Sequence, residues 1–134
     1  MRELPEHLLV CATNWVRRLD AAFLRPGRFD HVLPVGAPDA EARRAIWSRY
    51  AEEITDEPVD VDALVAESDL FTPADIEFAA RKAAQRAFER EHFEGTAHRA
   101  TDEDFLAAIR STRPSLSKEI LDSFGADVER YARY

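Results

Sequence analysis

The sequence predicts a mainly α-helical protein, in which a small helical bundle follows the partial edge of an α/β domain. Helix-start signals and apolar residues three or four positions apart recur through residues 39–134. Continuous apolar runs typical of buried strands occur only within residues 1–38. We therefore expect two domains with a boundary between residues 38 and 39.

The N-terminal domain is expected to contain two short strands and a short helix. The runs HLLVCAT (7–13) and FDHVLPVGAP (29–38) predict the strands, and VRRLDAAFL (16–24) predicts a helical turn between them. Two buried strands do not form a stable sheet by themselves. This segment therefore resembles the edge of a larger sheet.

The first two predicted helices follow directly. Residues 39–54 have Asp39 as the expected N-cap, and one face of this helix is expected to be apolar. That face comprises Ala42, Ile46, Tyr50 and Ile54. Residues 60–68 predict a shorter helix, with Val61, Leu64 and Val65 pointing inward.

Three further helices are predicted downstream. Residues 72–93 begin with Thr72 as N-cap, Pro73 at the first helical position and Asp75 three residues after the cap. Their expected inner face is a narrow stripe of Ile76, Ala79, Ala80, Ala83 and Ala87. Residues 101–112 repeat the cap with Thr101 and Asp104, and turn Phe105, Leu106 and Ile109 inward. The last helix is expected to start near Ser117 and to use Ile120, Leu121 and Phe124.

Composition excludes several classes of function. The 134 residues carry a formal net charge of −8, which argues against binding to nucleic acids or to anionic membranes. No apolar run approaches transmembrane length, and we expect a cytoplasmic protein. The single cysteine, Cys11, is expected to be a buried, reduced thiol. The four histidines lack metal-ligand spacing, so no metal site is expected in this chain.

The stretch LDAAFLRPGRFDH (19–31) places Arg25 and Arg28 on either side of a Pro-Gly turn. Proline and glycine hold such a loop stiff, and a guanidinium presents a planar cationic fork that matches phosphate or carboxylate. These arginines therefore suit phosphate recognition. The spacing fits equally well with two solvated surface arginines.

Three motifs in this order carry a family resemblance: CATN (11–14), LDAAFLRPGRFD (19–30) and FTPADIEFAARKAA (71–84). With them, the chain resembles the second half of the AAA ATPase module, most like the ring-forming unfoldases and segregases. The resemblance implies that residues 1–38 are the last part of a nucleotide-binding α/β domain. It also implies that residues 39–134 are the helical lid.

The resemblance assigns roles to three polar residues. Arg25 and Arg28 match the arginine fingers that reach across the subunit interface to the neighbour's γ-phosphate, where a cation offsets developing charge. Asn14 matches the polar sensor residue at the end of its strand, where an amide can bind the γ-phosphate or the attacking water. Without the family context, Asn14 reads as a turn-forming residue.

The resemblance also implies contacts with the adenine base. Ile46 and Tyr50 match positions that flank the base, although Tyr50 replaces a frequent histidine. Ala74 matches a helix start where backbone contacts adenine, and Pro73 replaces a small residue and removes one N–H donor. Core packing of the first lid helix explains Ile46 and Tyr50 equally well.

The sequence contains no G-x-x-x-x-G-K-[ST] phosphate loop and no apolar strand that ends in paired acids. We therefore expect a C-terminal piece of a longer ATPase that uses ATP with Mg²⁺, while this chain alone is inactive and binds no nucleotide tightly. The implied partners are neighbouring subunits of a homo-oligomeric, hexameric ring and protein substrates. The alternative is a stand-alone helical module that binds an acidic protein partner. The DNA-acting branches of the family fit poorly with the acidic composition.

Overall fold

A computed structural model describes residues 8–95 and 99–134, and within these ranges the protein is mainly helical, as predicted. A 3₁₀ turn, η1, spans Val16–Arg18. The α-helices are α1 (Ala40–Ile54), α2 (Val61–Glu67), α3 (Pro73–Glu94), α4 (Asp102–Arg110) and α5 (Lys118–Tyr131). None of the helices in the described ranges is long and apolar enough to cross a membrane.

The chain forms two compact units. The helical unit comprises Val35–Asp122, and the N-terminal unit comprises the described residues up to Pro34 together with Ser123–Tyr134. The sequence predicted domains of 1–38 and 39–134 instead. The grouping differs at the C-terminus because residues 123–134 contact the N-terminal segment through hydrogen bonds, described below.

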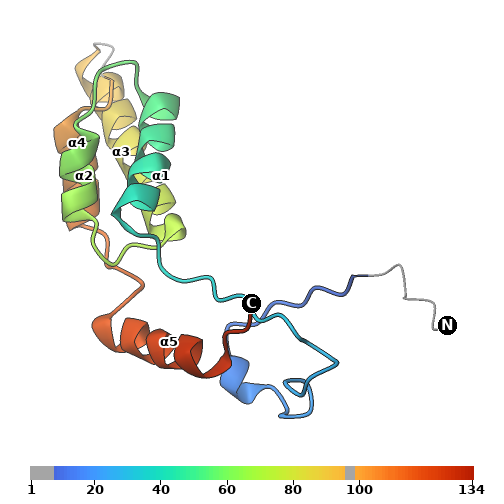
Figure 1. Cartoon of the computed structure of the whole chain (residues 1–134). Coiled ribbons are helices and arrows are strands. Elements are labelled where there is room, and N and C mark those ends of the chain that lie inside the picture. Colours follow the sequence, from blue (N-terminus) through green and yellow to red (C-terminus); the bar gives the residue numbers. More distant parts are fainter. Residues whose placement is uncertain (1–7, 96–98) are drawn as a thin grey trace. The chain divides into compact units, whose positions relative to one another are not determined.

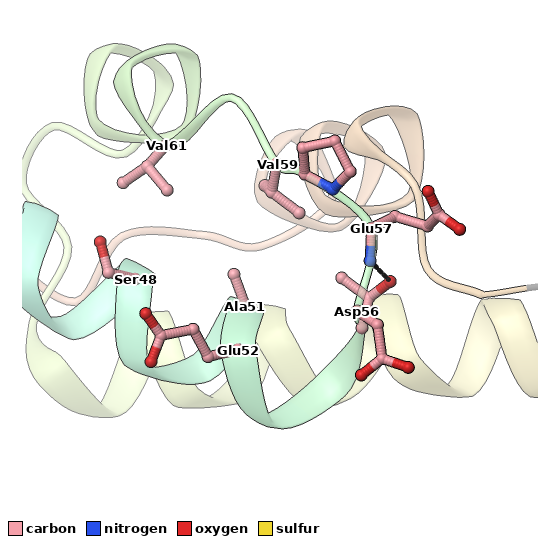
Figure 2. Close-up of a pocket in the computed structure, with 9 residues that line it drawn as sticks. Ser48, Ala51, Glu52, Asp56, Glu57, Val59 and Val61 are labelled. Atoms are coloured by element: carbon pink, nitrogen blue, oxygen red, sulfur yellow. Dashed lines mark hydrogen bonds between the residues drawn. The ribbon is translucent and has the colours of Figure 1, made fainter.

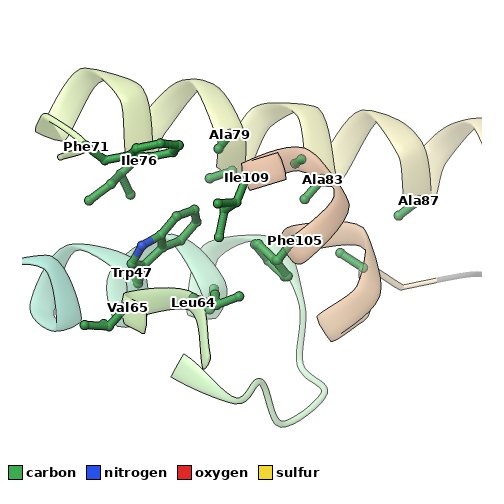
Figure 3. Packing of buried hydrophobic residues seen from close by; sticks show 14 residues of the cluster. Trp47, Leu64, Val65, Phe71, Ile76, Ala79, Ala83, Ala87, Phe105 and Ile109 are labelled. Atoms are coloured by element: carbon green, nitrogen blue, oxygen red, sulfur yellow. The ribbon is translucent and has the colours of Figure 1, made fainter. Parts of the chain in front are cut away.

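The helical unit is a bundle of α1, α2, α3 and α4, which lie side by side in Figure 1. Its core is shown in Figure 3, where α3 lies on one side of the buried side chains and α1 with α2 on the other. The predicted stripe on α3 is confirmed, because Ile76 and the four alanines after it are buried. Small side chains on this stripe let the neighbouring helices pack close to the α3 backbone.

Helix α1 packs with a different face from the one that the sequence predicts. Trp47 and Ala51 are its buried residues, while Ile46, Tyr50 and Ile54 are only partly buried around them. The Trp47 and Phe105 rings meet edge-on, with their centres 6.2 Å apart. The indole N–H of Trp47 donates to Ser68 Oγ at 2.9 Å. A buried indole needs such a partner for its N–H. The centre of the α1 interface is therefore set by contacts of Trp47 with α4 and with the residue after α2.

The predicted helix starts are confirmed. The Asp39 carboxylate accepts from Ala42 N at 2.8 Å. At α3, Asp75 N donates to Thr72 Oγ1 at 3.2 Å, and Thr72 N donates back to Asp75 Oδ2 at 2.8 Å. The pair satisfies two backbone donors that the first turn of a helix leaves free.

The two predicted strands do not form in the described residues. Residues 8–13 belong to no helix or strand, and residue 7 of the first predicted strand lies outside the described residues. Of the second strand, only Val32 pairs, in a single antiparallel bridge with Arg133. Cys11, expected to be buried, is exposed. The physical reason is that a strand is stabilised by neighbouring strands, and the described part of the chain supplies none.

Candidate functional site

The arginine loop, residues 20–30, is braced by its own backbone and acids. Phe23 N donates to Asp20 O at 2.9 Å, and Gly27 N donates to Asp30 Oδ1 at 2.6 Å. Gly27 has φ +85°, a left-handed conformation that favours glycine. The carboxylates of Asp20 and Asp30 thus accept hydrogen bonds from backbone N–H groups of the loop.

Both loop arginines are exposed to solvent. Arg28 donates from one guanidinium nitrogen to Ala22 O at 3.1 Å, which tethers its side chain across the loop. Arg25 makes no hydrogen bond or ion pair with any residue that the structure describes. The guanidinium of Arg25 therefore has all its donors available within the described residues. The guanidinium of Arg28 uses one nitrogen for Ala22 O and keeps its other donors available.

Asn14 lies in the same unit, just before η1, and is exposed. Within the described residues its side chain has no hydrogen-bond partner. The neighbouring turn is organised by Thr13, whose Oγ1 accepts from Trp15 N at 3.1 Å. The sensor role of Asn14 stays a prediction.

Ile46 and Tyr50 lie one turn apart on α1 in the helical unit, and both pack against the bundle core. Each is only partly buried, so part of each side chain still faces solvent. The packing explanation for these residues therefore holds in the structure. A contact with adenine would have to use their exposed edges, and it stays a prediction.

Pro73 and Ala74 are the first two residues of α3, and both are exposed. The residue that anchors this turn is Asp75, which is buried. Its carboxylate accepts from Thr72 on one side, and from Ser115 N at 3.1 Å and Ser115 Oγ at 2.6 Å on the other. The start of α3 is thereby fixed to the segment between α4 and α5.

The sequence predicts Asp75 and Asp104 only as members of helix caps. Asp104 also forms an ion pair with Arg90, which joins α4 to α3. Arg90 Nη2 donates to Asp104 Oδ2 at 2.6 Å. Burial favours the neutral form of each carboxyl, but hydrogen bonds from Ser115 and Thr72 lower the pKa of Asp75. Hydrogen bonds from Arg90 and Thr101 lower the pKa of Asp104 in the same way. Arg90 and Asp104 are 14 positions apart and lie in different helices, so no local sequence signal predicts the pair.

A shallow pocket lies between the C-terminal half of α1 and the connector to α2 (Figure 2). Its floor is apolar, with Ala51, Val59 and Val61, and its rim carries Glu52 and Glu57. None of the predicted site residues lines it. The acidic rim would repel a nucleotide phosphate.

The described residues do not by themselves form a site for ATP with Mg²⁺. They include no group of three or more histidine, cysteine or acidic side chains placed to hold a metal ion. Among the predicted site residues, Arg25 and Arg28 are the cationic ones, and the sequence has no phosphate loop beside them.

Comparison with curated proteins connects the whole chain to AAA ATPases. It is 36% identical over 127 residues to Cell division control protein 48 homolog B of Arabidopsis thaliana, a match that covers 94% of this chain and 21% of that protein. It is 32% identical to the Cell division cycle protein 48 homolog of Archaeoglobus fulgidus, over 85% of this chain and 17% of that protein. The chain thus spans about a fifth of the length of the curated relatives it matches. No family model matches it.

Solved structures show the same fold. The crystal structure of the FIGL-1 AAA domain in complex with ADP superposes with a TM-score of 0.78 at 23% identity. The match covers 90% of this chain and 43% of that one. The fold of the chain is thus that of part of an AAA domain.

Proposed function

Because this chain belongs to the AAA ATPase family, we propose that it supplies arginine fingers, a sensor amide and a helical lid to ATP hydrolysis in a ring. The proposed ring has six identical subunits and unfolds or remodels protein substrates. ATP with Mg²⁺ is the proposed substrate complex.

The observation that carries the proposal is the arginine loop. Arg25 and Arg28 project exposed cationic forks from a loop that its own hydrogen bonds hold in shape. The same sequence lacks a phosphate loop, so a phosphate for these forks must come from another polypeptide segment. An arginine delivered in trans to a γ-phosphate accelerates hydrolysis by roughly 10³-fold or more.

The lid is proposed to contribute more weakly. Pro73 and Ala74 are exposed at the start of α3, where adenine contacts are expected, and Pro73 offers no N–H. The exposed edges of Ile46 and Tyr50 can add apolar contact with the base. We therefore propose that this chain alone binds nucleotide poorly and does not hydrolyse it.

The experiment is ATP turnover by the protein encoded by the complete reading frame that contains this sequence. Arg28→Ala is expected to reduce kcat by roughly 10³-fold and to leave ATP binding nearly unchanged. Arg28→Lys is expected to restore little, since an ammonium cannot reproduce the planar fork. Arg18→Ala is the matched control, because Arg18 is also exposed but stacks on Trp15, with its guanidinium carbon 5.1 Å from the ring centre.

Mixing subunits tests the trans geometry. Arg28→Ala subunits combined with subunits that lack a working phosphate loop are expected to recover activity wherever an intact arginine faces an intact site. Rings that assemble but never recover activity would refute the trans role. If Arg28→Ala turns over ATP like the unaltered protein, the arginines are ordinary surface residues.

A helical interaction module is the second candidate, and one observation favours it. Helix α3 exposes Phe78, Phe88 and Phe93 on the side away from its alanine stripe. Exposed aromatic residues are enriched where proteins bind one another. Under this reading, substitutions at the phenylalanines would abolish partner binding, and Arg28→Ala would leave ATP turnover unchanged.

A further inference from the structure

The C-terminal strap, residues 123–134, contacts the N-terminal segment on both sides of the arginine loop and within it. Before the loop, Arg17 Nε lies 2.5 Å from Asp127 Oδ1, and Arg17 Nη2 donates to Ser123 O and Oγ at 2.8 Å each. After the loop, Val32 and Arg133 exchange two backbone hydrogen bonds of 3.0 and 3.1 Å.

The contact within the loop is the most specific of the three. Arg133 Nη1 donates to Leu24 O at 2.7 Å, and Leu24 is the residue directly before Arg25. The bond is partly buried, so it competes less with water than an exposed bond would. The backbone of Arg133 is thus bonded to Val32, while its side chain holds the carbonyl oxygen of Leu24, the residue before Arg25.

From these contacts we propose that Arg133 is a positioning residue for the arginine loop, and that the strap sets where Arg25 and Arg28 point. The inference rests on the proposed function. The loop is internally rigid through the bonds of Gly27 and Arg28, so anchoring it at Arg17, Leu24 and Val32 orients it as one body. Orientation matters because a displacement of about 1 Å at a reacting group can cost on the order of 10²-fold in rate.

Apolar burial does not account for the order of the N-terminal unit. The helical unit has a buried core, whereas none of the described residues of the N-terminal unit is buried. Hydrogen bonds and one ion pair therefore supply the order that apolar burial supplies elsewhere. Residues up to 110 positions apart in the sequence make these contacts, so removal of the strap leaves the loop with local bonds only.

The first test uses the 134-residue chain and does not depend on ATP. Arg133→Ala is expected to accelerate amide hydrogen exchange at Val32 and Leu24 about tenfold. The exchange rates of the amides in α3 should not change. Arg130→Ala is the matched control, since Arg130 lies on the same segment and only stacks over the Tyr131 ring. Unchanged exchange in Arg133→Ala would overturn the proposal at its structural step.

The second test measures turnover in the complete ATPase. Arg133→Ala is expected to lower kcat about tenfold with the KM for ATP unchanged, and Arg133→Lys to restore part of it, because an ammonium can still donate to Leu24 O. Adding Arg133→Ala to a variant that carries both Arg25→Ala and Arg28→Ala should cause no further loss, since the strap acts through these two arginines. A residue that only supports folding would lower the active fraction equally in both backgrounds.

The outcomes separate the two proposals. If Arg28→Ala is inactive and Arg133→Ala matches Arg130→Ala, the positioning role is wrong and the proposed function stands. If Arg28→Ala is fully active, the proposed function fails, and the exchange experiment still decides whether the strap orders the loop. A charge exchange, Arg17→Asp with Asp127→Arg, should recover the exchange protection that Arg17→Asp alone loses.

Discussion

The two tryptophans of this chain differ in burial, and one lies in each of its two units. Trp47 is fully buried in the bundle, whereas Trp15 is 62% exposed beside η1. The helical unit encloses its own apolar side chains, and the N-terminal unit exposes Leu8, Leu9 and Val10. The comparison shows that the helical unit is stabilised mainly by apolar burial and the N-terminal unit by polar contacts with the strap.

The largest expected effect compares the two tryptophans directly. Trp47→Ala should destabilise the helical unit by about 4 kcal/mol, because it leaves a large cavity and deprives Ser68 of its donor. Trp15→Ala should change the free energy of unfolding by less than about 0.5 kcal/mol. Urea denaturation followed by far-ultraviolet circular dichroism measures both. Equal losses would mean that the two units do not differ in how they are stabilised.

The second expected effect concerns the buried carboxylates that join helices of the bundle. Asp75 and Asp104 have lowered pKa values in the folded protein, whereas an unfolded aspartate titrates near about 3.9. Their stabilisation is therefore complete above that pH and is lost as the pH falls through the folded values. Asp104→Asn should cost about 2 kcal/mol at pH 7 and should flatten the acid limb of the stability profile.

Glu103→Gln is the control for that profile, since Glu103 lies in the same first turn of α4 but is exposed. It should leave both the stability at pH 7 and the acid limb nearly unchanged. A steep acid limb in Asp104→Asn would show that other carboxyl groups cause the acid sensitivity. Thermal melts between pH 2 and pH 7 distinguish the two cases.

The smallest expected effect on the bundle comes from removing the N-terminal unit altogether. A chain of residues 35–122 should unfold cooperatively, with a free energy within about 1 kcal/mol of that of the same helices in the full chain. The full chain should self-associate at high concentration through its exposed apolar N-terminal residues, and the shortened chain should not. Sedimentation velocity measures the association, and unfolded helices in the shortened chain would contradict the comparison.

Local signals predicted most of the helical unit. The caps at Asp39 and Thr72 join residues three apart, so the sequence contains both partners of each bond. The alanine stripe of α3 is likewise visible as spacing alone. The order of the three family motifs predicted the relationship to AAA ATPases that the comparisons show.

The strands and the inner face of α1 could not be predicted in the same way. An apolar run such as residues 8–13 has the composition of a strand, but its pairing depends on a neighbour that the sequence does not contain. On α1, the apolar spacing of Ile46, Tyr50 and Ile54 predicted an inner face that is one residue away from the buried one, which contains Trp47 and Ala51. Trp47 occupies that centre because its large ring meets Phe105 and its N–H meets Ser68.

The sequence by itself determined where the helices begin, which face of α3 is buried, and that two arginines flank a stiff turn, because each depends on residues within a few positions of one another. Only the tertiary structure decided that Asp75 holds Ser115 and that Arg133 holds the carbonyl before Arg25. Those bonds join residues 40 and 109 positions apart. No local pattern specifies such a pair, since its geometry exists only after the chain has folded.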